Sequence, residues 1–156
     1  MTRWLTEDEQ RAWLRLAGVM LKLTPSLDSQ LQRDSDLNHF DYLCLAMLSE
    51  THDRTMTMSA LAGRTNASLS RLSHVIKKLE ERGWVSRCPS PSSGRVTLVS
   101  LTDTGWTTLV AAAPAHVETV RSLVFEGLSE EDVSALERIS GQIVARIEGA
   151  GLDTTC

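Results

Sequence analysis

Apolar side chains recur at steps of three and four along much of this sequence, the spacing that places them on one side of an α-helix. The first such stripe follows the sequence TEDE at residues 6–9, a T-x-x-E capping box that predicts a helix start. Pro25 lies inside the stripe, and because apolar residues resume beyond it we predict a kink there and not a helix end. The stripe consists of Trp13, Leu16, Met20, Leu23, Leu27 and Leu31.

Two further helices are predicted before the middle of the chain. Asn38 is placed to cap the first of them, with Asp41 three residues on. Residues 51–58 indicate a loop and a short extended piece, after which Ser59 can cap a short helix over residues 59–64. Apolar residues cover much of the circumference of the helix after Asn38, so we expect it to be buried, with Cys44 as a small core residue: Phe40, Leu43, Cys44, Ala46, Met47 and Leu48.

The central segment, residues 66–101, predicts a helix followed by a β-hairpin. Gly83 follows Arg82 at the position expected for a helix C-terminal cap. Residues 84–89 and 96–101 are strand-like, and residues 89–95, PSPSSGR, are predicted to form neither a helix nor a regular strand. The predicted core-facing stripe of the helix is Leu69, Leu72, Val75, Ile76 and Leu79.

The other side of this central helix is polar, with hydroxyls near its start and cations further along. That order suits a helix that enters the major groove of DNA by its N-terminal end. Arg87 and Arg95 bracket the hairpin loop, and an arginine there is placed to reach a minor groove. The pattern is that of a winged helix-turn-helix, although a solvated helix face would look similar. The polar residues are Ser68, Ser70, Arg71, Ser73, His74, Lys77 and Lys78.

Both ends of the chain offer helices whose apolar stripes a small domain cannot cover. Thr102 can cap a helix that runs to Val124, which we expect to be broken at Pro114. Ser129 begins a last helix, and residues 149–156 are expected to fray. The last helix has a stripe of its own, which indicates a partner: Val133, Leu136, Ile139, Ile143 and Ile147.

Charge is unevenly distributed along the chain. The whole sequence carries a net charge of −4, whereas residues 54–95 hold eight Lys and Arg against two acids, a net +6. An electrostatic field polarised in this way favours one local binding site for a polyanion over non-specific binding to the whole surface.

Several classes of protein are disfavoured by what the sequence lacks. There is no apolar run long enough to span a membrane and no apolar leader at the start, so we expect a cytoplasmic protein without a membrane partner. Three scattered cysteines fit a reducing compartment. No G-x-S-x-G, P-loop, G-x-G-x-x-G or H-E-x-x-H motif occurs, so neither catalysis nor a cofactor is expected. The four histidines lack the close pairings typical of zinc sites, but they could still converge in space.

The segment SALAGRTNASLSRLSHVIKKLEERGWVSR, the wing ending GRVTLVSLT and the following DTG together resemble the MarR family of winged helix-turn-helix transcription factors. The resemblance implies a mainly α fold with a small β-hairpin wing. It also implies one domain over residues 1–156, with helical dimerisation regions at 1–36 and 103–150 around a DNA-binding lobe at 37–102. The alternatives are a winged-helix protein–protein adaptor and a metal-responsive regulator.

The resemblance also assigns DNA contacts. His74 stands where many members carry Arg, and the wing has Ser92, Ser93 and Gly94 where members often place an Asp beside the wing arginine. Arg95 matches the arginine that enters the minor groove. The base-facing part of the central helix would comprise Ser68, Ser70, Arg71, Ser73 and His74, with Lys77 reaching backbone or base.

A member of this family would be a homodimer that binds a pseudo-palindromic double-stranded operator, most often as a repressor. Many members are released from DNA by a small aromatic or phenolic effector bound between the dimerisation helices and the DNA-binding lobe. Ordinary packing is the alternative role for the side chains that could line such a crevice here: Trp13, His39, Phe40, Tyr42 and Met47.

Overall fold

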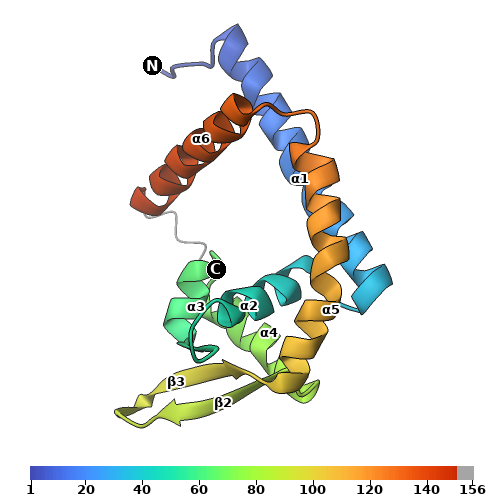
Figure 1. Ribbon diagram of the computed structural model, residues 1–156. Coiled ribbons are helices and arrows are strands. Elements are labelled where there is room, and N and C mark those ends of the chain that lie inside the picture. The colour runs from blue at the N-terminus through green and yellow to red at the C-terminus, as the bar shows by residue number, and fades with distance from the viewer. Residues whose placement is uncertain (151–156) are drawn as a thin grey trace.

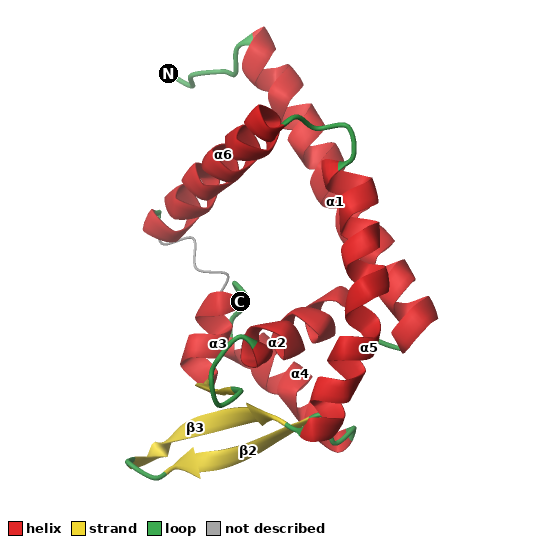
Figure 2. Cartoon of the chain, viewed as in Figure 1, coloured by secondary structure: helices red, strands yellow, loops and turns green. Residues whose placement is uncertain are grey.

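A computed structural model describes residues 1–150 and is mainly helical with one small sheet (Figure 2). The fold class expected from the sequence is therefore confirmed. No helix among the described residues is long and apolar enough to cross a membrane. In chain order the elements are α1 Glu7–Ser35, α2 His39–Ser49, β1 Thr55–Thr57, α3 Met58–Arg64, α4 Leu69–Glu81, β2 Val85–Ser90, β3 Ser93–Leu101, α5 Asp103–Val120, the π-helical η1 Arg121–Phe125 and α6 Glu130–Gly149.

Most helix starts lie where the capping residues predict them. Thr6, Asn38 and Ser129 each form a complete capping box, and Thr102 caps α5. The prediction for the third helix was wrong by two residues, because Thr57 and not Ser59 caps it. The chain leaves β1 directly into α3, and the Thr57 hydroxyl accepts from the backbone N–H that comes three residues later.

The sheet has three antiparallel strands in the order β1-β3-β2. The extended piece predicted after residue 51 is β1, which pairs with β3 beside the β2–β3 hairpin. The prediction for residues 89–95 was wrong, since β2 runs to Ser90 and β3 starts at Ser93. Pro89 is tolerated in a strand because β2 is an edge strand and its register shifts at that point. Arg95 consequently lies on β3, close to the tip of the wing.

The hydrophobic core lies in the winged-helix part of the molecule, with contributions from the C-terminal end of α1 and the first half of α5. Cys44 is part of it, as expected, and its thiol pKa is raised to about 12 by burial. The largest fully buried apolar side chains come from six different elements and the α1–α2 corner: Leu31, Leu37, Leu45, Leu48, Leu61, Leu72, Ile76, Leu79, Val85 and Val99.

The helices α1 and α5 lie side by side and form the long arm seen in Figure 1. α1 continues through Pro25, as predicted. The predicted break at Pro114 was wrong, because α5 is continuous from Asp103 to Val120. A proline removes one main-chain hydrogen bond, but α5 also packs against α1 and α2, which supports the helix around it. The irregular turn comes later, in η1.

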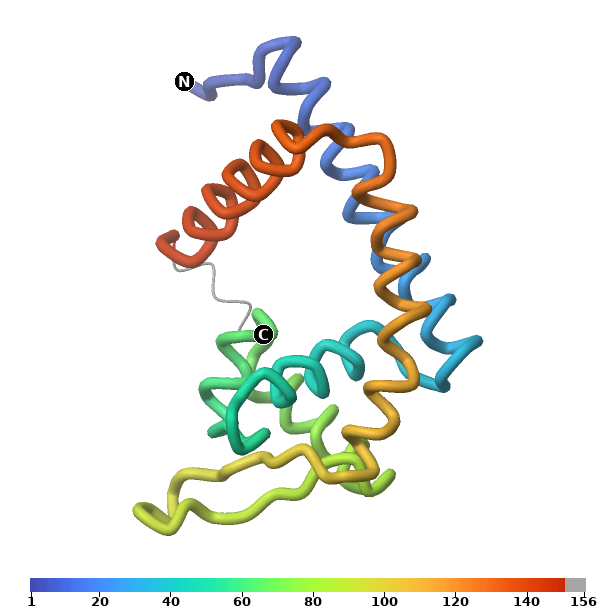
Figure 3. The backbone as a smooth tube through the Cα atoms, viewed as in Figure 1, coloured from blue at the N-terminus to red at the C-terminus, as the bar shows by residue number. Residues whose placement is uncertain are grey.

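α6 turns away from the arm and has no buried residue (Figures 1 and 3). The N-terminal half of α1 is likewise uncovered, whereas Leu27 and Leu31, at the C-terminal end of the predicted stripe, are buried in the core. Most of the apolar side chains in the first half of α1 and in α6 therefore have no cover among the described residues. Fraying was predicted from Gly149, which is the last residue of α6, and residues 151–156 lie outside the described residues. The exposed apolar side chains include Trp13, Leu16, Val19, Met20, Leu123, Leu136, Ile139, Ile143 and Ile147.

Gly105 is placed where the start of α5 touches the base of the wing. A Cβ built on Gly105 would lie only 2.1 Å from the Trp84 carbonyl oxygen and 2.7 Å from Leu101 Cδ1. Since backbone cannot yield as a flexible side chain can, only glycine permits this approach.

We predict that Gly105→Ala lowers the free energy of unfolding by at least about 1–3 kcal/mol, the usual cost of overpacking. Chemical denaturation followed by circular dichroism measures this change. Gly63→Ala is the matched control, because a Cβ there meets nothing within 4 Å. That control should stabilise the protein by roughly 0.5–1 kcal/mol. Equal effects of the two variants would contradict the close approach at Gly105.

Candidate nucleic-acid interface

The pair α3 and α4 forms a helix-turn-helix. Ser68 is the N-cap of α4, and its hydroxyl oxygen accepts from the Arg71 N–H at 3.2 Å. At the other end, Gly83 has a φ of +73°. The N–H groups of Gly83 and Trp84 bond the carbonyls of Glu80 and Leu79, at 2.9 and 3.0 Å. This is a Schellman motif, which ends the helix and turns the chain into β2.

The two sides of α4 divide largely as the sequence predicts. Leu72, Ile76 and Leu79 are buried and Val75 is half-buried. Leu69 was predicted in the same stripe, but its side chain is 53% exposed. It lies in the first turn of α4, ahead of the part that the core covers. The exposed polar residues of α4 include five of the predicted DNA contacts, whereas Ser68 is half-buried at the cap: Ser70, Arg71, Ser73, His74 and Lys77.

The eight cations of residues 54–95 fall into two groups. Five of them form ion pairs with carboxylates: Arg54–Asp103, Arg64–Glu50, Lys78–Asp41, Arg82–Asp36 and Arg87–Glu80. Arg71, Lys77 and Arg95 form no ion pair with any described residue. The unpaired positive charge is therefore on α4 and the wing, on three of the residues predicted to meet DNA.

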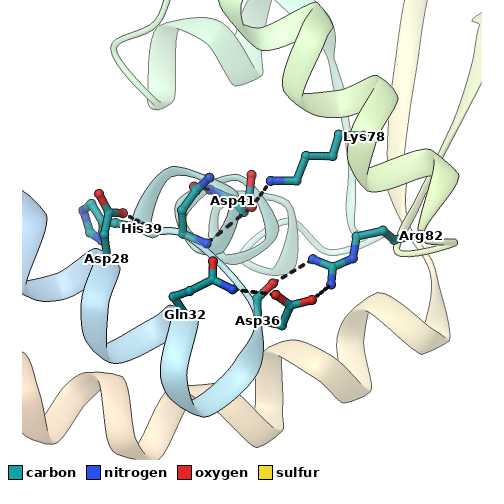
Figure 4. A network of polar contacts seen from close by, with 8 residues as sticks. Asp28, Gln32, Asp36, His39, Asp41, Lys78 and Arg82 are labelled. Atoms are coloured by element: carbon teal, nitrogen blue, oxygen red, sulfur yellow. Dashed lines mark hydrogen bonds and ion pairs between the residues drawn. The ribbon is translucent and has the colours of Figure 1, made fainter.

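Two of the paired cations hold α4 against the corner between α1 and α2 (Figure 4). Lys78 Nζ lies 2.5 Å from Asp41 Oδ2, and the Asp41 carboxylate is fully buried. The Arg82 guanidinium bonds both the carbonyl of Asp36, at 2.7 Å, and its carboxylate. Hydrogen bonds from Gln32 and then from Arg82 lower the pKa of Asp36. Lys78 and Arg82 thus orient the helix, and neither belongs to the unpaired cations of the segment.

Another ion pair joins α4 to the wing. Glu80 accepts from the Arg87 backbone N–H at 3.0 Å and from two guanidinium nitrogens, Nε at 3.0 Å and Nη2 at 2.6 Å. These hydrogen bonds lower the pKa of Glu80. Arg87 is therefore a structural residue at the base of β2, and Arg95, near the tip, is the wing arginine that remains unpaired.

The predicted effector residues are only partly brought together. His39 and Tyr42 meet His116 of α5, with ring centroids 5.6 and 4.3 Å from it. Phe40 lies under the Arg71 guanidinium, 4.2 Å from its carbon, and Met47 packs half-buried against the core. Asp28 of α1 marks the level of this cluster, because its carboxylate accepts from the His39 backbone N–H at 2.7 Å. Trp13 precedes Asp28 by about four turns of α1, so it lies about 22 Å away along the helix at 1.5 Å per residue.

The cluster of His39, Tyr42 and His116 includes a partner that sequence reasoning missed. His116 is buried, and its Nδ1 lies 3.2 Å from the Gln30 side-chain oxygen, across 86 residues of chain. No local spacing could have linked them. His39 Nδ1 is buried and has no hydrogen-bond partner among the described residues.

Both histidines are biased toward the neutral form. Burial lowers the pKa of His39, and the Asp28 carboxylate partly opposes this effect. Burial also lowers the pKa of His116, and His39 adds to the shift. Within residues 1–150 no group of three or more His, Cys, Asp or Glu side chains is arranged to hold a metal ion.

The fold, the exposed side of α4 and the wing define a winged helix-turn-helix DNA-binding protein. The MarR family model matches residues 37–97. The MarR family transcriptional regulator Sco3205 from Streptomyces coelicolor, whose structure is in complex with DNA, is 40% identical with a TM-score of 0.88. That match covers 93% of this chain and 90% of Sco3205. A second regulator from the same organism, AbsC, is 38% identical with a TM-score of 0.89, covering 95% and 99% of the two chains.

Curated relatives agree with this assignment. The transcriptional repressor IacR from Pseudomonas putida is 28% identical over 91% of this chain and 81% of its own length. The regulator YdcH from Bacillus subtilis is 31% identical over 51% of this chain. That match covers 55% of the length of YdcH. The chain belongs to the MarR family of DNA-binding transcriptional regulators, which is not a family of enzymes.

Proposed function

We propose that this protein is a homodimeric, sequence-specific regulator that binds a pseudo-palindromic operator through α4 in the major groove and Arg95 in the minor groove. The observation that carries the proposal is the division of the cations, which leaves Arg71, Lys77 and Arg95 without an acidic partner among the described residues. Unpaired cations on a helix and an adjacent hairpin suit phosphates and groove edges. Repression is the proposed direction of control, supported by the relative IacR, a repressor.

In this proposal, different segments of the chain bind DNA and form the dimer. Residues 37–102 would bind DNA, and residues 1–36 and 103–150 would supply the dimer interface. The boundary is not a boundary of the core, because Leu31 and Leu109 from the outer segments are buried with the central residues. The dimerisation helices would therefore move the DNA-binding part directly, without a flexible linker.

A second copy of the chain is the proposed occupant of the groove beside α1. The groove has a volume of about 720 Å³ and lies between α1, η1 and the start of α6. Its lining includes Leu14, Val19, Leu23, Leu123 and Leu136, and most of these side chains are exposed in a single chain. Leaving so many apolar side chains in water is costly, and a two-fold interface would bury them.

We also propose that a small aromatic effector binds near His39 and Tyr42, where α1, α2 and α5 meet. Support comes from His39 Nδ1, which is buried without a partner. A lowered pKa keeps this imidazole neutral, so it suits a phenolic hydroxyl better than a carboxylate. Trp13 would belong to such a site only if the partner subunit brought it there.

The first prediction concerns the unpaired cations. Lys77→Ala should weaken binding to a selected duplex and lower the slope of log affinity against log salt by roughly 2 for the dimer, about 0.9 for each lost phosphate contact. Arg95→Ala should weaken binding through the wing. Fluorescence anisotropy at several salt concentrations gives both quantities.

Arg64→Ala is the matched control, because Arg64 pairs with Glu50 and is not assigned to DNA. Its salt slope should stay within error of the unmodified protein. If Lys77→Ala and Arg95→Ala both leave affinity and salt dependence unchanged, the proposed roles of α4 and the wing are wrong.

The second prediction concerns the dimer. Sedimentation at micromolar concentration should give twice the 17.2 kDa chain mass. Leu136→Asp introduces a charge into the proposed interface and should produce monomer or loss of cooperative folding, because an unpaired carboxylate is costly to bury. His52→Asp, in an exposed loop away from the groove, is the control and should remain dimeric. A folded monomer of unmodified protein would refute the interface.

The third prediction concerns the effector. At least one member of a panel of phenolic acids should raise the thermal unfolding midpoint, because a ligand that binds only the native state stabilises it. His39→Ala should abolish that rise, and His52→Ala should keep it. A panel without any shift, or a shift that survives in His39→Ala, would remove support for this site.

A further inference from the structure

Leu69 is an exposed apolar side chain at the start of the recognition helix. Single exposed leucines are ordinary on protein surfaces and need no explanation by themselves. This one is the first residue of α4, and 53% of its surface is exposed. The first turn of a recognition helix is the part that lies deepest in the major groove, so the position of Leu69 matters.

The neighbours of Leu69 define what it would face. Residues at steps of four lie in rows along a helix. Leu69, Ser73 and Lys77 form one such row, and Ser70 and His74 form the row beside it; all five are exposed. Leu69 is thus the one apolar member of a surface that otherwise offers hydroxyls, an imidazole and an ammonium group. A polar surface of this kind hydrogen-bonds base edges, and the leucine cannot.

Only one major-groove group matches an aliphatic side chain, namely the C5-methyl of thymine. The other groove-edge groups are hydrogen-bond donors and acceptors, whose desolvation by leucine would be unfavourable. Leu69 is not among the side chains that line the groove assigned to the second copy, which come from α1, η1 and α6. The proposed dimer interface therefore does not explain why Leu69 is exposed.

We infer that Leu69 is a specificity-determining residue that contacts a thymine methyl group in each operator half-site. The inference rests on the proposed entry of α4 into the major groove. It adds a base preference that the polar residues of α4 do not supply. The contact is worth about one buried methyl group, which corresponds to a roughly fourfold preference for thymine in each half-site.

Uracil tests the contact, because it pairs as thymine does and lacks only the methyl group. The full-length protein is used to select duplexes from two random libraries, one with thymine and one with uracil in its place. With the thymine library, thymine should be enriched at one position of each half-site, and with the uracil library that enrichment should fall. On one selected duplex, exchanging that base for uracil should weaken binding about fourfold in each half-site.

Leu69→Ala should bind the thymine and uracil duplexes with equal affinity, close to that of the unmodified protein for uracil. Its unfolding midpoint should be unchanged, since the side chain is largely exposed. Leu69→Gln, which keeps the length of the side chain, should also lose the discrimination. His52→Ala changes an exposed loop residue outside α4 and the wing and should keep it.

The outcomes distinguish a failure of the Leu69 contact from a failure of the proposed function. Salt-dependent, sequence-selective binding in which Leu69→Ala still discriminates thymine from uracil overturns the role of Leu69 and leaves the proposed function intact. The same conclusion follows if the unmodified protein binds both duplexes equally. A protein that selects no sequence from either library overturns the proposed function and the role of Leu69 together.

Discussion

The ion pair between Lys78 and the buried carboxylate of Asp41 fixes where the recognition helix lies. A buried carboxylate is unfavourable unless it is compensated. Asp41 meets this requirement with the Lys78 ammonium group and with the backbone N–H of Asn38, at 3.4 Å. Its other oxygen, Oδ1, has no partner among the described residues, so the lysine contributes most of the compensation. One carboxylate thereby caps α2 and holds α4, and α4 cannot rotate away without exposing an uncompensated charge to the core.

The remaining polar contacts extend this attachment in both directions. Arg82 connects the C-terminal cap of α4 to Asp36 at the C-terminal cap of α1, and Glu80 connects the last turn of α4 to Arg87 on β2. Arg71 stacks on Phe40 of α2, although it carries no ion pair with a described residue. The helix is therefore connected to the corner at which α1 ends and to the wing. A shift of the α1–α2 corner would be transmitted to the DNA-facing side through stiff contacts, which is how a dimer or an effector could alter DNA binding.

Local chemistry explains what could be predicted from the sequence. Capping boxes act over three residues, so the starts of α1, α2 and α6 were predictable, as were the Gly83 cap and the buried stripe of α4. Two of the errors arose where distant packing decides. Pro89 is accepted because β2 is an edge strand, and α5 passes Pro114 while packed on α1 and α2. The sequence indicated the net positive charge of the central segment but not which cations are paired, because Arg82 and Asp36 are 46 residues apart.

The ion pairs also reduce the positive charge that residues 54–95 present to a ligand. A net charge of +6 over residues 54–95 suggests a broad electrostatic surface. Four of the five acids that pair with its cations, however, lie outside that segment and become neighbours only on folding: Glu50, Asp36, Asp41 and Asp103. Non-specific attraction scales with the number of cations that can displace counterions from phosphate. Because five of the eight cations of this segment form ion pairs within the protein, little unpaired positive charge remains for non-specific binding. For the proposed function, discrimination between DNA sequences would then depend more heavily on the short side chains and the single leucine of the first two turns of α4.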